Sequence, residues 1–527
     1  MSLEQETAAA PEQAAPQQAA PQQAAPQPAA PQQVAPQQAA PQPMVPMPLG
    51  LMLRLGTDAF EAGRLKEAEA IASNLLRSSS HDPQVLQLSG IIAFRTGRQE
   101  LAVQFLEKAI QIAPQQALFH RNISEMYRQI DRLDDALAAV RQAVSLMPGD
   151  PVALHNMAVI HHQRGEAEES IAASRRALLL KHDLAGSHFA IAEAQLLRGE
   201  MAEGWERYEW RFRIPGVPPL MPPAIEEGRS QWGGSRLPAG QRLMLVGDQG
   251  FGDVIQFSRY IPWVLEQTDD IFLALSREMA PLISRMFPGI DIRQRWGDCR
   301  DFSEYCALSS LPRLHGTRLG TVPPPVPVPR DPAREAAWAE RLAAALPPGL
   351  RRIGIVWAGR PSHKNDRNRS IAFQTLASVL GPVPGIALVS LQKGEREADL
   401  KTYAGAAPLF DAGPHLAEYE ETVAAIAALD LVVTVDTSVA HLAGTLGHPA
   451  WVLLPFIPDW RWLRDREDSP WYPSLRLFRQ QASFDWRPPL ASVAAELGRL
   501  SASSGKEERP RAASAGLSGG AGAGEEG

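Results

Sequence analysis

The chain has 527 residues, and the composition of its two ends excludes a packed core. Residues 1–48 carry proline at every fifth position from Pro11 to Pro46 among Gln and Ala, and residues 503–527 are mostly Gly, Ala, Ser and charged residues, so both are predicted to be disordered tails. A formal net charge of −7 argues against a broad basic surface, and we expect no nucleic-acid partner.

The cysteine content and the apolar runs bear on location. Only Cys299 and Cys306 occur, which excludes a disulfide framework and favours a reducing compartment. The N-terminal residues lack the basic and apolar regions of a secretory signal, and no stretch reaches about 18 uninterrupted apolar residues. We therefore expect a cytoplasmic protein without a transmembrane segment.

A repeat of 34 residues opens the folded part, with units starting at residues 49, 83, 117, 151 and 185. The eighth and twentieth residues of each unit are small, as at Gly90 and Ala102, and the fifteenth is Gly or Asp, as at Gly97. Small residues let two antiparallel helices approach closely, and Gly or Asp supplies the left-handed conformation that ends the first helix. The pattern resembles the tetratricopeptide repeat and predicts five repeats over residues 49–216.

The first helices of stacked repeats line a concave groove. The sixth residue of the third and fourth units is Asn122 and Asn156, whose amides can hydrogen-bond the backbone of an extended peptide. We predict that both bind a protein acceptor; the alternative is two solvated amides on an exposed helix face. The fifth repeat continues into aromatic residues that are expected to pack the solenoid on the next domain. They are Trp205, Tyr208, Trp210 and Phe212.

After residue 242 short apolar runs alternate with helical patterns. In a first half, residues 217–330, strands are predicted at 243–246, 271–275 and 291–295. A proline-rich linker leads to a second half, residues 331–502, with strands predicted at 352–357, 386–391, 431–435 and 451–454. Strands that alternate with helices predict parallel sheets, whose ligands bind beyond the carboxyl ends of the strands.

The first of these strands is followed by Gly247, Gly250 and Gly252. Ile255 stands where a dinucleotide fingerprint requires another glycine, and no Gly-Lys-Ser/Thr loop occurs anywhere in the chain. These two facts exclude an NAD site and a P-loop.

Four segments carry a resemblance to a known family: residues 250–256, 357–360 with 363–370, 390–393 and 436–444. They resemble segments of bacterial GT-B glycosyltransferases related to the ADP-heptose lipopolysaccharide heptosyltransferases. The order of five repeats followed by these segments is similar to that of tetratricopeptide-repeat proteins with a family 9 type glycosyltransferase domain, some of which are implicated in flagellin O-glycosylation. The resemblance implies an α-solenoid followed by an α/β GT-B fold of two Rossmann-like domains, with a nucleotide-sugar donor.

Inverting glycosyl transfer needs a base for the acceptor proton and a positive environment for the departing phosphate. Asp253 matches the position of the family's proposed base, and the alternative, which is compatible with it, is a carboxylate that caps a helix. The candidates for donor binding follow strands of the second half: Lys364, Arg367, Arg369, Gln392, Asp436, Thr437, Ser438 and His441.

Arginine presents a bidentate fork to phosphate oxygens, and the free N–H groups at a helix start can hold a phosphate. The alternatives are a solvated basic loop and an ordinary helix cap. The sequence has no Asp-x-Asp motif, so neither a metal nor a cofactor is expected besides the donor. The aromatic residues Trp460, Trp462, Trp471 and Tyr472 are expected to pack a returning C-terminal helix, with sugar stacking as the alternative.

Together these features predict an enzyme that docks a protein on its repeats and transfers a sugar from a nucleotide-sugar to a Ser or Thr. Flagellin is among the acceptors that the resemblance implies. One alternative is a heptosyltransferase-like enzyme that modifies lipopolysaccharide or another glycan, although a glycan acceptor would not require a peptide-sized groove. The other is a non-catalytic adaptor with a degenerate GT-B domain.

Overall fold

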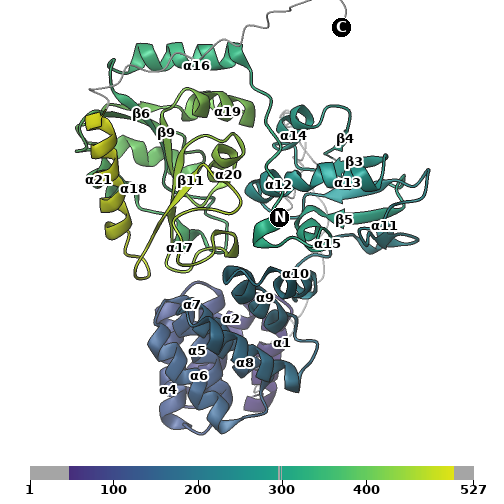
Figure 1. The fold of residues 1–527 in the computed structure, drawn as a ribbon. Coiled ribbons are helices and arrows are strands. Elements are labelled where there is room, and N and C mark those ends of the chain that lie inside the picture. Colours follow the sequence, from purple (N-terminus) through teal and green to yellow (C-terminus); the bar gives the residue numbers. More distant parts are fainter. Residues whose placement is uncertain (1–46, 295–296, 298, 504–527) are drawn as a thin grey trace, which may run out of the picture. The chain divides into compact units, whose positions relative to one another are not determined.

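The structure is a computed structural model, and it describes residues 47–294, 297 and 299–503 (Figure 1). The predicted tails, residues 1–48 and 503–527, lie outside the described residues except for 47, 48 and 503. The chain divides into two compact units, Met1–Asn122 and Ile123–Gly527. This division falls inside the third repeat, whereas the sequence pattern placed a boundary after residue 216.

Ten helices form the five predicted repeats, and the first helix of every repeat begins at the residue that the 34-residue period predicts. The helices are α1 (Leu49–Glu61), α2 (Leu65–Ser79), α3 (Pro83–Arg95), α4 (Gln99–Ile112), α5 (Ala117–Gln129), α6 (Leu133–Leu146), α7 (Pro151–Gln163), α8 (Ala167–Leu180), α9 (Ala185–Leu197) and α10 (Met201–Tyr208).

The turn residues and the small residues take the roles that the sequence predicts. The five turn residues all have positive φ: Gly63 at 73°, Gly97 at 83°, Asp131 at 65°, Gly165 at 78° and Gly199 at 83°. The small residues allow close helix packing, since a Cβ added at position 90 would lie 2.1 Å from a methyl carbon of Leu106. The helices and their turn residues therefore follow the period of 34 residues.

The first α/β half contains a parallel sheet with the strand order β1-β5-β2-β3-β4. Its strands are β1 (Ser230–Gln231), β2 (Leu243–Val246), β3 (Ile271–Ala274), β4 (Asp291–Arg293) and β5 (Glu304–Ala307). Its helices and 3-10 turns, with the turn that follows α10, are η1 (Glu209–Arg213), α11 (Pro223–Glu226), α12 (Phe251–Phe257), η2 (Ser258–Tyr260), α13 (Ile261–Gln267), α14 (Ala280–Met286), η3 (Leu308–Ser310), α15 (Leu311–Leu314) and η4 (Leu319–Thr321).

The second half contains a parallel sheet with the order β11-β10-β9-β6-β7-β8. Its strands are β6 (Arg351–Val356), β7 (Ile386–Ser390), β8 (Leu409–Asp411), β9 (Leu431–Val435), β10 (Ala450–Leu454) and β11 (Leu475–Arg479). Its helices and 3-10 turns are α16 (Pro332–Ala345), α17 (Asp366–Arg369), α18 (Phe373–Leu380), η5 (Glu395–Thr402), η6 (Gly413–His415), α19 (Tyr419–Ala427), α20 (Ser438–Thr445), η7 (Trp460–Trp462) and α21 (Arg487–Ser503).

Both sheets reverse their strand order at one point, between β2 and β5 in the first half and between β6 and β9 in the second. At such a point the helices after the two strands lie on opposite faces, and ligands of open α/β sheets bind there. The predicted site residues follow β2, β6, β7 and β9, so the topology places most of them beside these two points.

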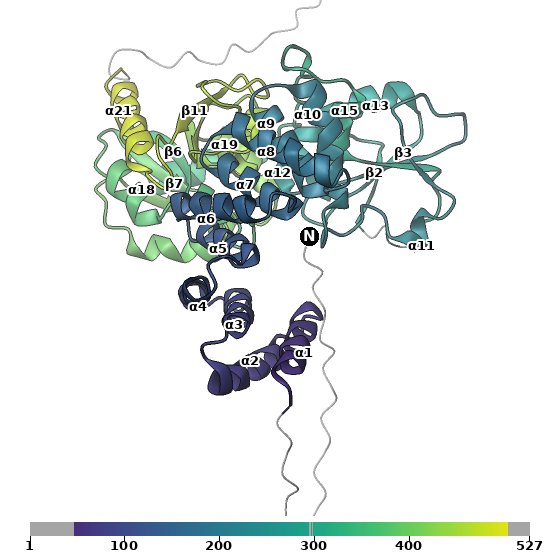
Figure 2. The same ribbon diagram turned by 90° about the horizontal axis from the view of Figure 1, so that it is seen from below.

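Each strand of the second sheet alternates between two cores, because successive side chains point to opposite faces. Ile353 and Ile355 pack with α18 and α21, whereas Val356 packs in the core that contains α19 and α20. Both views show α18 and α21 side by side (Figure 1, Figure 2).

The fifth repeat packs directly on the α/β region, as the aromatic residues at its end predict. Trp205 donates a hydrogen bond from its indole N–H to the carbonyl oxygen of Thr317 at 3.1 Å, and its ring lies 5.0 Å from that of Trp460. The expectation that Trp460 and Trp471 pack the returning C-terminal helix is wrong. These rings belong to the core that contains Trp205, whereas the buried leucines of α21 belong to the core around α18.

Candidate functional site

Asp253 lies in the first turn of α12, directly after the turn that follows β2. Its Oδ2 accepts a hydrogen bond from the backbone N–H of Gly250 at 3.0 Å. Gly250 is the residue before the helix, so this carboxylate satisfies one of the N–H groups that a helix start leaves open. Asp253 therefore caps α12, and a further role as a base remains a prediction.

The second oxygen of Asp253 accepts a hydrogen bond from Arg461 of η7, in the other half of the α/β region. The same guanidinium donates from Nε to Gln256 Oε1 at 2.7 Å and pairs through Nη1 with Asp459 Oδ2 at 2.9 Å. We call these four residues the Arg461 cluster. Sequence reasoning missed Arg461, because the residues around it were interpreted only as an aromatic stretch.

The Arg461 cluster is poorly exposed to solvent, and this changes the acidity of its carboxyl groups. The Asp253 side chain is 19% exposed. Burial raises the pKa of Asp253 to about 6, the guanidinium of Arg461 opposes this rise, and the carboxyls of Asp459, Asp248 and Asp436 add to it. A carboxyl with such a pKa is mostly ionised at neutral pH and still well matched to accept a proton.

The start of α20 has a different character from the start of α12. Thr437 is the residue before the helix, and its side chain makes no capping hydrogen bond; its hydroxyl lies 3.2 Å from that of Thr434. The Ser438 hydroxyl accepts a hydrogen bond from Tyr419 at 3.0 Å. Because Thr437 does not cap this helix start, an anion can approach its N–H groups.

His441, one turn into α20, packs against the start of α12. A Cβ added at Gly252 would lie 2.6 Å from His441 Cδ2, so only glycine allows this approach. His441 is buried, and its Nδ1 lies 3.1 Å from the hydroxyl of Tyr472. Burial lowers the pKa of His441 well below its usual value, so the ring is neutral. The structure thus brings Asp253 and the predicted phosphate-binding helix together.

The basic side chains of the loop after β6 have different partners. Arg369 donates from Nη1 to the backbone carbonyl of Asp436 at 3.0 Å, so its guanidinium lies beside the start of α20. Arg367 instead donates to the carbonyl of Gln129 at 3.4 Å and packs over the ring of Phe484. Lys364 is exposed. Of the three predicted cations in this loop, the contacts place Arg369 at the start of α20 and direct Arg367 toward α5.

Two other predicted residues near β6, β7 and β9 are buried. The amide of Gln392 accepts from the N–H groups of Trp357 and Ala358 at 3.1 and 3.0 Å and donates to the carbonyls of Ala358 and Lys393. These bonds hold the loop after β6 and leave the amide no free donor for a ligand. The Asp436 carboxyl is buried, and its pKa is raised by that burial.

Arg360 is another residue that sequence reasoning did not select. It is exposed, and its guanidinium lies 5.2 Å from the centre of the Phe251 ring, at the first residue of α12. Phe251 also contacts Tyr419, which bonds Ser438. The sequence signal that could have identified Arg360 was its position four residues after β6, a strand beside the point where the strand order of the second sheet reverses.

The two predicted acceptor residues fall in different compact units. In the first unit Asn122 lines a cavity of about 340 Å³ together with polar residues of α1 and α3, among them Thr57, Gln84 and Gln87. In the second unit Asn156 is half-buried on α7. Binding of an acceptor by either residue stays a prediction.

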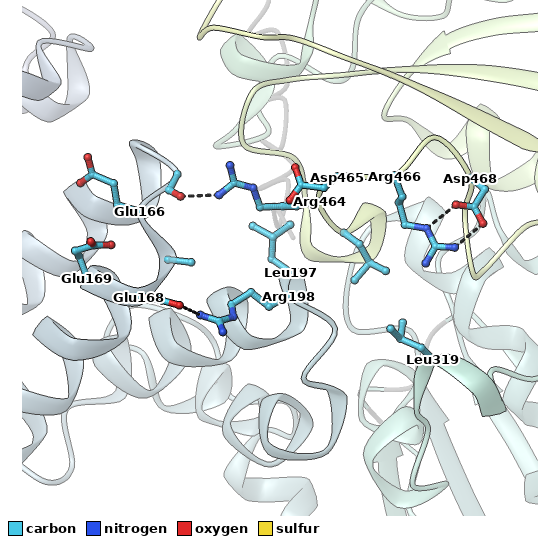
Figure 3. Close-up of a pocket in the computed structure, with 13 residues that line it drawn as sticks. Glu166, Glu168, Glu169, Leu197, Arg198, Leu319, Arg464, Asp465, Arg466 and Asp468 are labelled. Carbon is cyan, nitrogen blue, oxygen red and sulfur yellow. Dashed lines mark hydrogen bonds and ion pairs between the residues drawn. The ribbon is translucent and has the colours of Figure 1, made fainter.

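A larger cavity, of about 710 Å³, lies in the second unit between the turns of the fourth and fifth repeats and the segment after η7 (Figure 3). Arg464 donates a hydrogen bond to the carbonyl oxygen of Gly165 at 2.5 Å, and Arg198 forms an ion pair with Glu168 at 3.3 Å. Its lining mixes leucines with both signs of charge, and none of the predicted site residues belongs to it.

Among the residues that the structure describes, no group of three or more His, Cys, Asp and Glu side chains could hold a metal ion. No helix there combines the length and apolar character needed to cross a bilayer.

Comparison with known proteins identifies the repeats. The family model for the tetratricopeptide repeat matches residues 83–116, which contain α3 and α4. Protein FlbA of Caulobacter vibrioides is 30% identical over 349 residues, covering 61% of this chain. The chain spans 56% of the length of that curated relative. This chain therefore contains tetratricopeptide repeats.

Solved structures also match part of this chain. The tetratricopeptide-repeat protein TTC0263 of Thermus thermophilus is 21% identical, with a TM-score of 0.29, and the match covers 32% of this chain and 92% of that one. A crystal structure of MamA is 17% identical, with a TM-score of 0.27, and covers 30% of this chain and 93% of that one.

Proposed function

We propose that this protein is a glycosyltransferase of the GT-B type, which transfers a sugar from a nucleotide-sugar to a Ser or Thr of a protein that docks on its repeats. The observation that carries the proposal is the contact between α12 and α20 at Gly252 and His441. This contact joins a carboxyl suited to accept a proton to a helix start suited to hold a phosphate. Because the sequence has no Asp-x-Asp motif, the proposed reaction is metal-independent.

In the proposed reaction the acceptor hydroxyl gives its proton to the carboxylate of Asp253. The acceptor oxygen forms a bond to the anomeric carbon of the donor, and the bond between that carbon and the phosphate oxygen breaks. The electron pair of the broken bond leaves with the nucleoside diphosphate. Arg369 and the N–H groups at the start of α20 stabilise the charge of this leaving group.

The repeats favour a protein acceptor over a lipid-linked glycan. Stacked repeats of this type provide concave surfaces that suit an extended chain, and amide and hydroxyl groups are among those that line the cavity beside Asn122. Such groups can pair with the N–H and C=O groups of a peptide. A flagellin acceptor is a finer form of the proposal and depends on the family resemblance alone.

The test is to incubate the full chain with a panel of nucleotide-sugars and to measure the released nucleotide, with flagellin, an unrelated protein or a lipid-linked glycan as acceptor. Release that requires a protein and labels its Ser or Thr supports the proposal. Release with the glycan alone would favour the heptosyltransferase-like alternative. A chain that binds proteins but releases no nucleotide from any donor would be an adaptor.

Asn122→Ala adds a test of docking. Removal of one amide that bonds a peptide should weaken acceptor binding by about 1 kcal/mol, roughly fivefold, while hydrolysis of the donor in water continues. Gln115→Ala, at an exposed residue before α5, is the matched control. Equal acceptor affinity of the two variants would place docking elsewhere on the solenoid.

A further inference from the structure

Arg461 is a buried cation whose three side-chain partners come from both halves of the α/β region. It is 7% exposed, and its bonds to Asp253 and Gln256 reach α12, whereas its bond to Asp459 stays within its own segment. The backbone N–H of Arg461 also donates to Asp459, at 3.1 Å. With partners on Nε and both terminal nitrogens, the guanidinium has a fixed orientation.

This cation balances several acidic groups. Asp253, Asp459 and Asp436 all interact with it electrostatically, as does the Tyr208 hydroxyl of the fifth repeat. A buried charge without a partner is strongly unfavourable, so loss of the cation would favour protonation of the neighbouring carboxyls. For Asp253 that would remove the form able to accept a proton.

The bonds also fix the direction of the Asp253 carboxylate. One oxygen accepts from Gly250 N–H and the other from Arg461. A carboxylate oxygen has two lone pairs, so each oxygen keeps one for a further donor. The carboxylate is thus held at both oxygens while a site for an acceptor hydroxyl remains.

We propose that Arg461 is the positioning residue of the reaction, which holds Asp253 ionised and correctly oriented from the opposite half of the α/β region. This inference depends on the proposed function, because it assumes that Asp253 is the base. Arg461 itself need not touch either substrate, since it acts through Asp253.

Other groups face the same carboxylate and set the background of the test. Asp248 comes from the loop after β2, Tyr208 from α10, Asp459 from the segment before η7 and Asp436 from the end of β9. Among them Arg461 is the group that lowers the pKa of Asp253. Three further titratable groups face Arg461 or Asp459: Glu193, His363 and His441.

The test measures kcat/KM for sugar transfer against pH for the wild type, Arg461→Gln and Arg461→Lys. Activity of the wild type should fall as the pH drops below about 6, the raised pKa of Asp253. In Arg461→Gln the pKa of the base rises, so this acid limb should move upward by about 1 to 3 pH units. Arg461→Lys retains the charge and should keep the limb near its original pH, with a lower plateau because the fork is lost.

Arg466→Gln is the control, because Arg466 lies on the same segment and pairs with the exposed Asp468. Its acid limb should stay at the position found for the wild type. If Arg461→Gln lowers activity equally at every pH, with the limb unmoved, Arg461 has only a structural role and the inference is overturned.

A second measurement does not need turnover. The thermal midpoint is compared for the wild type, Arg461→Gln, Asp253→Asn and the double variant. Arg461→Gln should lower the midpoint less when Asp253 is already neutral, and equal losses in both backgrounds would overturn the coupling. If the wild type uses no nucleotide-sugar, the proposed function fails, and the cycle still decides whether Arg461 and Asp253 are coupled.

Discussion

The starts of α12 and α20 occupy corresponding places in the two sheets, each after a strand beside the point where the strand order reverses. At α12 the carboxylate of Asp253 accepts the N–H of Gly250. At α20 the residue before the helix makes no side-chain cap, and Arg369 lies beside it instead. The start of α12 is therefore capped by a carboxylate, whereas the start of α20 has no side-chain cap and lies beside a cation.

This difference decides what each helix start can bind. At α12 the negative charge of the Asp253 carboxylate repels an anion, whereas the helix dipole and the N–H groups of α20 attract it. In the proposed reaction the two halves, which have the same type of sheet, would therefore have different roles. The first half would accept the proton, and the second would bind the phosphate. Each prediction below tests this division, from the largest expected effect to the smallest.

Asp253→Asn tests the acid side of the comparison. Asparagine keeps the size of the side chain and an oxygen that can accept the Gly250 N–H, but it cannot take up the acceptor proton. Transfer should fall by about 10²- to 10⁴-fold with donor affinity little changed, which steady-state kinetics and titration with the donor would measure. Normal transfer with only a lower melting temperature would reduce Asp253 to a helix cap.

Arg369→Ala tests the cationic side. Loss of a charged partner for the phosphate should weaken donor binding roughly 10- to 100-fold, as measured by calorimetric titration with the nucleoside diphosphate. Arg367→Ala is the matched control from the same loop, because Arg367 bonds the carbonyl of Gln129. Equal losses in the two variants would mean that the loop acts through its net charge and not through the position of Arg369.

Thr437→Ala tests the open helix start itself. Its hydroxyl is expected to bond a phosphate oxygen, so its removal should weaken donor binding by about 3- to 10-fold. Thr437→Ser keeps the hydroxyl and should bind like the wild type in the same titration. A loss shared by both variants would point to the methyl group and therefore to packing.

The smallest effect concerns Glu193 on α9. Its carboxyl belongs to the fifth repeat and lies near Asp459, one of the acidic groups around Asp253. Burial raises the pKa of Glu193 to about 8. The folded state therefore holds this proton more tightly than the unfolded chain, and the contribution to stability is lost as the pH rises from about 4.5 to about 8. Glutamine does not titrate, so Glu193→Gln should remove this loss of stability with rising pH.

The melting midpoint of Glu193→Gln should exceed that of the wild type by about 1 to 3 °C at pH 8, with a much smaller difference at pH 5. Glu200→Gln, which alters a surface pair with Arg198, should show no such dependence on pH. A constant difference between Glu193→Gln and the wild type at all pH values would show that Glu193 does not titrate in this range.

The sequence by itself determined the repeats and much of the α/β order. A strict period of 34 residues fixes where helices begin, and the local conformation of Gly97 or Asp131 ends them whatever surrounds them. The core strands β2, β6 and β9 were also predictable, because strands buried on both faces read as apolar runs. The strands β1, β5, β8 and β11 were missed, since a few residues without a continuous apolar run carry little pattern.

Tertiary structure alone decided which candidates meet. Asp253 and Arg461 are 208 residues apart in the chain, so no local pattern joins them. Arg367 and Arg369 are two residues apart and point to different partners, and the amide of Gln392 bonds only backbone groups. A sequence motif fixes which side chains follow a strand, whereas the packing of the two halves and the fifth repeat fixes where each side chain points and whether its charge is buried.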